Sequence, residues 1–363
     1  MRIWQIVALL VAGVLAGLIW PHQFGRFFGQ ITLLVLLPAL LFEAAWNLEA
    51  RVLLTNWRPV ALLALPGVVL TALIVGAAAH LAGIPWLDAL LLGSILSATD
   101  PIAVAAIFKQ LNVPTALATI IQGESLLNDA MAVVLYRAML AAVLIGLTPR
   151  AGETLFALAL LGIFAGIGIG VALGWAFSWV MRDRRGLAVC IVTTVCAAYA
   201  SYYVAEHFGF SGLFATLACS VSLRRFSSPF LSETMIEGVY RVWDIGAASA
   251  NVVLFFLIGA AVALAGILNN PYLIGATLVG IGVSRILLAY GLLAFVRPRL
   301  TWGWMHVVRV AGVRGALSLA LAISLPSRLP YRGAIIDAVF AVVLVTIAIS
   351  ALRIERTVTK VDF

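Results

Sequence analysis

Apolar runs of about twenty residues recur along the whole chain, separated by short polar or charged connections. A helix of this length crosses about 30 Å of hydrocarbon, where backbone polar groups must be paired internally. The pattern therefore predicts an all-α polytopic membrane protein. We expect about twelve transmembrane helices, at residues 3–20, 27–46, 59–82, 86–108, 115–147, 154–181, 187–207, 210–223, 243–264, 271–296, 303–325 and 334–352.

Composition supports this class and argues against others. Of the 363 residues, 64% are hydrophobic and 10% charged, with a mean hydropathy of +1.12, whereas soluble domains are roughly 45–50% apolar and 25% charged. The net charge of +8 indicates no nucleic-acid partner, because no polar domain carries a basic patch. Cys190, Cys196 and Cys219 lie in apolar segments without paired spacing, so we interpret them as packing residues.

The distribution of Lys and Arg predicts the orientation in the membrane. With alternate connections assigned to opposite sides, fifteen of these residues fall on one side and four on the other. A bias of this size places the richer side in the cytoplasm. We therefore expect a multi-pass protein of the plasma (inner) membrane, with an even number of spans and both termini cytoplasmic.

Ionisable residues inside the spans mark the candidate site. An ionised side chain near the bilayer centre costs roughly 2.5–3.5 kcal/mol. Structural ion pairs between helices are one explanation, but three of the four acids lie within thirty residues of sequence, which favours a functional cluster. The acids are Glu43, Asp100, Glu124 and Asp129, and the arginines are Arg137, Arg285, Arg309 and Arg314.

The polar run Gly-Glu-Ser-Leu-Leu-Asn-Asp places oxygen atoms on two faces of one predicted helix. Ser125 and Asp129 are four residues apart and share a face, while Glu124 and Asn128 share the neighbouring face, about 100° away. Ser125 and Asp129 can jointly ligate a small hard cation. Glu124 is free to meet a positive partner, and Arg285 is the obvious candidate because it stands alone in an apolar span.

Two spans carry signals of an interrupted helix. In Ser-Ala-Thr-Asp-Pro, Pro101 disfavours helical geometry at the preceding residue, so we expect a break at Thr99 and Asp100. A simple proline kink is the alternative, but the polar residues Thr99 and Asp100 at the break favour a binding site over a kink. The glycine-interrupted segment 312–326 carries Arg314, which can offset the helix-end charge when no cation is bound. Two such interrupted spans are typical of transporters built from inverted repeats.

Three other functions are consistent with parts of the pattern. Clustered acids also select cations in channels, but a filter-like repeat is missing from the sequence. K⁺/H⁺ antiport would use the same acids. The run Gly-Phe-Ser-Gly has the form of an intramembrane protease nucleophile, yet neither His207 nor His306 is paired with Ser211 by any local pattern.

Six motifs, in this order and spacing, resemble the sodium/proton antiporters of the NhaP/NHE type, within the monovalent cation:proton antiporter families. The resemblance covers essentially the whole chain. The motifs are Leu-Leu-Pro-Ala-Leu-Leu-Phe-Glu (36–43), Ala-Thr-Asp-Pro (98–101), Gly-Glu-Ser-Leu-Leu-Asn-Asp (123–129), Phe-Ser-Gly-Leu-Phe-Ala (210–215), Ser-Arg (284–285) and Gly-Val-Arg-Gly-Ala (312–316).

The resemblance implies a role for each matching residue. Asp100 and Asp129 correspond to the cation and proton carriers, and Thr99 and Ser125 to further oxygen ligands of Na⁺. Glu43 matches an acid that reaches the ion site from the dimerisation domain. Three further correspondences are a structural ion pair between Glu124 and Arg285, charge compensation in the core by Arg314, and Asn128 as the mark of the electroneutral branch.

The resemblance also implies the architecture. Members of this type have two inverted six-helix repeats with a pair of crossing discontinuous helices, and they form homodimers. Here the dimerisation helices correspond to 1–58 and 187–265, the core ion-transport helices to 59–147 and 271–352, and the linker helix to 154–181. The leading helix of the usual thirteen spans is missing from this pattern, which puts the dimer interface in doubt more than the ion site.

A mechanism follows from two carboxylates that face one site of low dielectric. When the site is empty they cannot both stay ionised cheaply, so the pair binds either a proton or a cation. We therefore expect exchange of Na⁺ or Li⁺ for H⁺ by alternating access, without a cofactor and without enzymatic chemistry.

Overall fold

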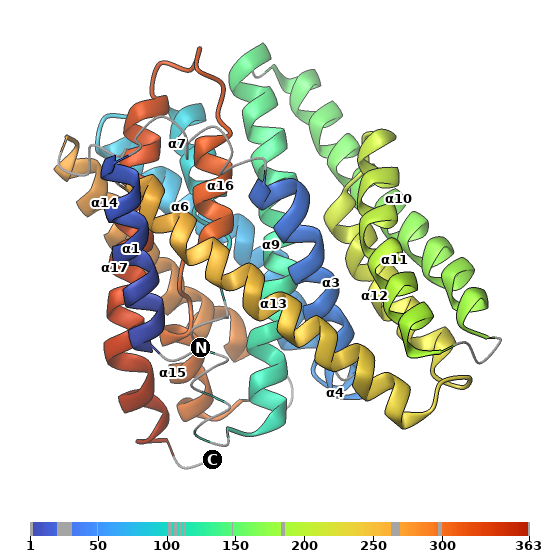
Figure 1. The fold of residues 1–363 in the computed structure, drawn as a ribbon. Helices are drawn as coiled ribbons and strands as arrows, with labels where there is room; N and C mark the ends of the chain where they lie inside the picture. The colour runs from blue at the N-terminus through green and yellow to red at the C-terminus, as the bar shows by residue number, and fades with distance from the viewer. Residues whose placement is uncertain are drawn as a thin grey trace. The chain divides into compact units, whose positions relative to one another are not determined.

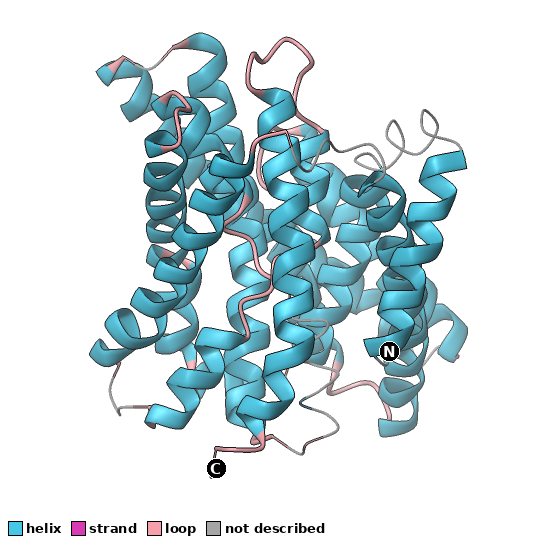
Figure 2. Ribbon diagram, turned by 90° about the vertical axis from the view of Figure 1, so that its left-hand side faces the viewer, coloured by secondary structure: helices cyan, strands magenta, loops and turns pink. Residues whose placement is uncertain are grey.

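The structure is a computed structural model that describes residues 3–19, 31–48, 50–100, 104, 108, 111, 113–146, 148–182, 186–262, 269–296 and 300–361. Every regular element in these ranges is a helix (Figures 1 and 2). Seven of the described helices are long and apolar enough to cross a membrane, and shorter apolar helices occupy Ala8–Ile19, Thr32–Asn47 and Trp86–Ile95. The all-helical membrane class is confirmed, while the number twelve stays a prediction.

The chain divides into two compact units. The first unit comprises Met1–Thr32, Arg51–Leu147 and Leu254–Phe363. Its helices are α1 (Ile3–Ile19), α4 (Ala50–Thr55), α5 (Trp57–Ala64), α6 (Pro66–Leu81), α7 (Trp86–Ile95), α9 (Thr115–Ile145), α14 (Pro271–Ile286), the π-helix η2 (Leu287–Gly291), the 3₁₀-helix η3 (Leu292–Phe295), α15 (Trp302–Val310), α16 (Ala316–Ile323) and α17 (Arg332–Val358).

Buried apolar side chains from α5, α9 and α15 form one core of the first unit. Leu63, Leu117, Ile120 and Val307 have no exposed surface and belong to one cluster. Small residues let helices of this unit approach closely, because a Cβ added at Gly93 of α7 would overlap the backbone of Ala72 in α6. The core therefore fixes α9 beside the interrupted helices.

The second unit comprises Leu33–Ala50 and Thr148–Val253. Its helices are most of the π-helix η1 (Thr32–Leu36), α3 (Leu37–Asn47), α10 (Pro149–Met181), α11 (Leu187–His207), α12 (Gly212–Ser227) and the first part of α13 (Glu233–Val262). Phe42 and Trp46 are fully buried in its core, where the Phe42 ring lies 4.9 Å from that of Trp243.

Glycines spaced by four residues along α10 pack against α12. A Cβ at Gly170 would overlap the carbonyl oxygen of Ala215, and one at Gly166 would lie 2.5 Å from that of Ser211. Gly168, on another face of α10, has open space around its position. The glycine spacing therefore gives α10 a smooth face for close packing.

Several expected spans differ in detail from the helices of the structure. The range 86–108 is not one helix, because α7 ends at Ile95, and the range 303–325 is divided between α15 and α16. The expected span at 243–264 begins earlier, since α13 starts at Glu233. Interior packing extends α13, because Val239 and Trp243 are buried in the core of the second unit.

Candidate ion-binding site

Two helix breaks meet inside the first unit. The helix α7 ends at Ile95, and residues 96–100 are not helical; a second non-helical stretch, 311–315, separates α15 from α16. The backbone N–H of Asp100 donates a hydrogen bond to the carbonyl oxygen of Val313 at 2.8 Å. The predicted interruption is therefore present, although it begins at Leu96 rather than at Thr99, and Pro101 lies outside the described residues.

Arg314 and Ser318 satisfy carbonyl groups at and beyond the end of α7. Arg314 has no exposed surface, and its Nη1 donates to the carbonyl oxygens of Ser97 at 2.8 Å and Ala98 at 2.9 Å. The hydroxyl of Ser318 donates to the carbonyl of Ile95 at 2.8 Å. Since a helix C-terminus carries partial negative charge and unpaired carbonyls, a buried guanidinium stabilises this broken end.

The helix α9 presents a polar face to the α7 break. Ser125 donates a short hydrogen bond to the Thr99 carbonyl, and the Thr99 hydroxyl lies 3.4 Å from Ser125 Oγ. Asn128 Nδ2 donates to Thr99 Oγ1 at 3.3 Å. All three side chains are buried. This network brings together Thr99, Ser125 and Asn128, three of the residues that the sequence singled out.

Asp100 and Asp129 lie close enough for their charges to interact, and Arg314 and Glu124 also act on the Asp129 carboxylate. Among the described residues, the buried Oδ1 atoms of Asn128 and Asp129 accept no hydrogen bond. Buried oxygen atoms of this kind normally have a donor or a cation as partner. The chemistry of these atoms fits a small monovalent cation such as Na⁺.

Glu124 and Arg285 form a buried ion pair beside the site. Arg285 Nη1 lies 2.8 Å from Glu124 Oε1, and the two side chains are 6% and 2% exposed. The guanidinium packs directly on Gly312, where an added Cβ would overlap Arg285 Nε. The pair therefore connects α9 and α14 to the stretch between α15 and α16.

Glu43 lies in the second unit, on α3. Its carboxylate accepts a short hydrogen bond from Asn47, one helical turn later, and the charge of Asp244 acts on it. The side chain is partly buried. Participation of Glu43 in ion binding stays a prediction.

Several residues of the site carry no clear signal in the sequence. Gly315 matters because an added Cβ would overlap the Asp100 carboxylate, so a side chain is excluded there. Thr346 of α17 accepts a hydrogen bond from the Arg314 backbone N–H at 3.2 Å. From the sequence, the glycines that flank Arg314 predict only an interrupted helix. Their close contacts with Asp100 and Arg285 depend on segments that are distant in the sequence.

Ser211 has a structural explanation. It is the N-cap residue of α12, and its hydroxyl accepts from the backbone N–H of Phe214 at 3.5 Å. Glu206 accepts from the neighbouring Gly212 N–H at 3.0 Å, which helps to satisfy the same helix start. Gly209 has φ +75°, a conformation that favours glycine. The Gly-Phe-Ser-Gly run thus serves as a turn and helix cap.

Broken helices that meet beside carboxylates inside a polytopic helical protein are typical of the class of secondary transporters. The model of the family described as "Sodium/hydrogen exchanger, transmembrane" matches residues 1–360, and the chain is a member of this family.

Relatives and solved structures agree with this assignment. The chain is 34% identical over 338 residues to the Na⁺/H⁺ antiporter ApNhaP of Aphanothece halophytica, covering 91% of this chain and 64% of that protein. It is 31% identical over 350 residues to the low-affinity Na⁺/H⁺ antiporter NhaS1 of Synechocystis, covering 92% and 65%. It thus spans slightly less than two thirds of each relative. The sodium proton antiporter MjNhaP1 of Methanocaldococcus jannaschii has the same fold, with a TM-score of 0.82 at 18% identity over 98% of this chain and 92% of that one.

Proposed function

We propose that this protein exchanges Na⁺ or Li⁺ for H⁺ across a membrane. The observation that carries the proposal is the position of Asp100 and Asp129, whose charges interact where two helix breaks meet the polar face of α9. Membership of the sodium/hydrogen exchanger family, and the similarity to relatives named as Na⁺/H⁺ antiporters, support the same function. The protein is a transporter rather than an enzyme.

Competition between ions is the proposed basis of coupling. Repulsion between Asp100 and Asp129 favours uptake of a proton or a cation, and Na⁺ displaces the proton because both use the same carboxylate oxygens. Thr99, Ser125 and Asn128 supply further oxygen atoms near these acids. A site that opens to one side of the membrane at a time then exchanges the two ions, and no further component is needed.

Three finer features belong to this proposal. Asn128 stands where a second carboxylate would add charge, so exchange is electroneutral, with one cation per proton. Glu43 contributes a ligand from the dimerisation helices, and the core helices move relative to that scaffold in a homodimer. The protein lies in the plasma (inner) membrane with both termini in the cytoplasm, as the Lys and Arg bias indicates.

Proton flux in proteoliposomes with an internal pH dye tests the proposal. The native chain is pulsed with Na⁺, Li⁺ or K⁺, with and without valinomycin and K⁺ to clamp the voltage. The test variant is Asp129→Asn. Its control is Glu153→Gln, which also removes one carboxylate but at an exposed position near the start of α10.

Cation-dependent proton movement is expected in the native chain and in Glu153→Gln, unaffected by the clamp and lost in Asp129→Asn. Full exchange in Asp129→Asn would exclude the proposed role of that carboxylate. Current without proton coupling would identify a channel, and a response to K⁺ alone would identify K⁺/H⁺ antiport.

A further inference from the structure

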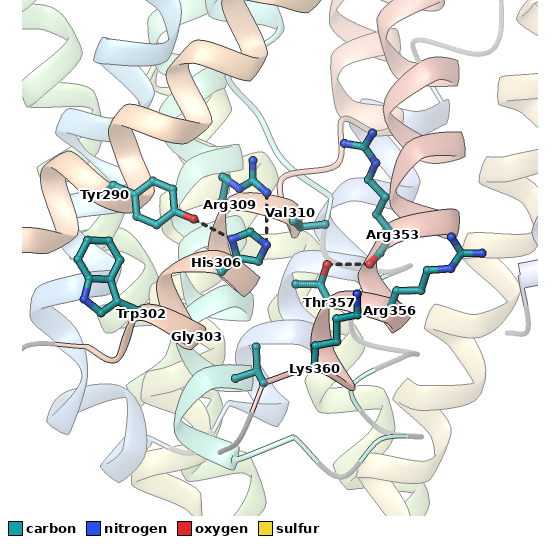
Figure 3. A pocket seen from close by; sticks show the side chains of 11 residues that line it. Tyr290, Trp302, Gly303, His306, Arg309, Val310, Arg353, Arg356, Thr357 and Lys360 are labelled. Atoms are coloured by element: carbon teal, nitrogen blue, oxygen red, sulfur yellow. Dashed lines mark hydrogen bonds between the residues drawn. The ribbon is translucent and has the colours of Figure 1, made fainter.

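A separate cavity of about 520 Å³ lies in the first unit, between α15 and the end of α17. Figure 3 shows the lining side chains in two groups, with Tyr290, Trp302, His306 and Arg309 on one side and Arg353, Arg356 and Lys360 on the other. The volume is within the range of about 300–1,000 Å³ that is typical of small-ligand sites. None of these residues belongs to the ion site described above.

The lining is strongly cationic. Four of the eleven lining residues carry a full positive charge, and no Asp or Glu is among them. They come from distant parts of the sequence: Arg309 from α15, and Arg353, Arg356 and Lys360 from the last turns of the chain. The fold therefore brings together like charges that repel one another unless an anion is bound.

One wall of the cavity is ordered by side-chain contacts. The Tyr290 hydroxyl is 2.8 Å from His306 Nδ1, and Arg309 Nη2 is 3.4 Å from His306 Nε2. Since a guanidinium only donates, Nε2 accepts, and the neutral imidazole carries its proton on Nδ1 and donates it to Tyr290. This arrangement holds the Arg309 guanidinium at the cavity. Its Nε atom is buried and has no hydrogen-bond partner within the described chain.

Orientation in the membrane explains only part of this arrangement. Arginine and lysine that set topology need only to face the cytoplasm, where each can be solvated separately. Here they surround a concave site in which a histidine and a tyrosine position one guanidinium. Arg353, Arg356 and Lys360 are exposed and can close on a ligand from the other side.

We infer that this cavity binds a phosphate-bearing anion at the cytoplasmic face. Guanidinium groups pair with phosphate oxygens through two parallel hydrogen bonds, and several cations around one cavity favour a ligand with more than one negative charge. Either an anionic lipid headgroup or a soluble phosphate compound supplies this chemistry. Trp302 is 77% exposed at the rim, as expected of a side chain at the membrane interface.

Binding to the purified, delipidated full chain tests the inference. One arm titrates inorganic pyrophosphate by calorimetry, and the other counts bound cardiolipin by native mass spectrometry. The pocket variant is Arg353→Gln with Arg356→Gln. The control is Arg58→Gln with Arg241→Gln, which removes the same charge from exposed positions outside the cavity. Arg356→Glu serves as a second pocket variant.

We expect the native chain and the control to bind at least one probe saturably, with affinity at least about tenfold weaker in both pocket variants. Binding of pyrophosphate would identify a soluble ligand class, and binding of cardiolipin alone would identify a lipid headgroup. Equal affinity in pocket and control variants, or no binding of either probe to the native chain, would overturn the inference. Because binding is measured without ion exchange, these outcomes are independent of the proposed transport function.

Discussion

The carboxylate of Asp100 packs directly against Gly315, with no room for a Cβ atom between them. The two residues are far apart in sequence and come from the two helix breaks. The hydrogen bond from the Asp100 N–H to the Val313 carbonyl joins the backbones of the same two helix breaks. The position of this carboxylate, a candidate ion ligand, thus depends on the absence of a side chain at a distant residue.

The substitution Gly315→Ala is expected to displace the Asp100 carboxylate. Because misplacement of a functional group by about 1 Å can cost up to about a hundredfold in rate, we expect Na⁺-dependent proton flux to fall by at least about tenfold. Gly282→Ala is the control, since a Cβ at Gly282 has open space. Equal flux in the two variants would show that Asp100 tolerates displacement.

Arg314→Gln is expected to destabilise the end of α7. The carbonyls of Ser97 and Ala98 would lose their donor, at about 1–3 kcal/mol for each buried group left unpaired. Arg314→Lys should recover part of this loss, because it restores the charge but not the paired geometry. Thermal unfolding in detergent measures both. Arg241→Gln, at an exposed ion pair, should change stability by less than about 0.5 kcal/mol. If Arg314→Gln unfolds like this control, the guanidinium does not stabilise the break.

Removing one partner of the Glu124 and Arg285 pair leaves a buried charge without compensation. We expect Glu124→Gln and Arg285→Met each to lower the free energy of unfolding by about 3–5 kcal/mol. The double variant should lose less than the sum of the two, because no lone charge remains. Chemical denaturation of the four proteins completes the cycle. Strict additivity would mean that the contact at 2.8 Å contributes no coupling.

Sodium should stabilise the native chain against heat if it binds at the proposed site. A ligand present at a hundredfold over its Kd contributes about 2.7 kcal/mol. Because protons compete for the same carboxylates, this stabilisation should shrink as the pH falls. Asp129→Asn should remove the Na⁺-dependent shift of Tm, and Glu153→Gln should keep it. A shift that persists in Asp129→Asn would place the cation elsewhere.

Much of the candidate site can be predicted from the sequence. Asp129 and Ser125 share a helical face by spacing alone, and in the structure α9 runs as one helix from Thr115 to Ile145. The pairing of Glu124 with Arg285 is predictable because each is a costly charge in an apolar span. Their separation of 161 positions, however, means that only the fold could bring them to 2.8 Å.

Other features depend on contacts that no local pattern encodes. The break in α7 begins at Leu96, before the residues expected from Pro101, because Arg314 and Ser318 satisfy the carbonyls of Ile95, Ser97 and Ala98. The length of α13 similarly reflects burial of Val239 and Trp243 in the second unit rather than hydropathy. The cationic cavity combines residues of α15 with residues at the end of α17, so its lining residues do not form one continuous stretch of the sequence.

The sequence by itself determined that this is a helical membrane protein, that two of its helices are interrupted, and that a few buried acids need a partner. These properties follow from the cost of placing backbone and charge in hydrocarbon, which acts on each segment separately. Only the tertiary structure decided which carbonyls Arg314 satisfies, why position 315 must be glycine, and where four cations surround one cavity. These depend on contacts between distant segments, because packing and hydrogen bonding act through space and not along the chain.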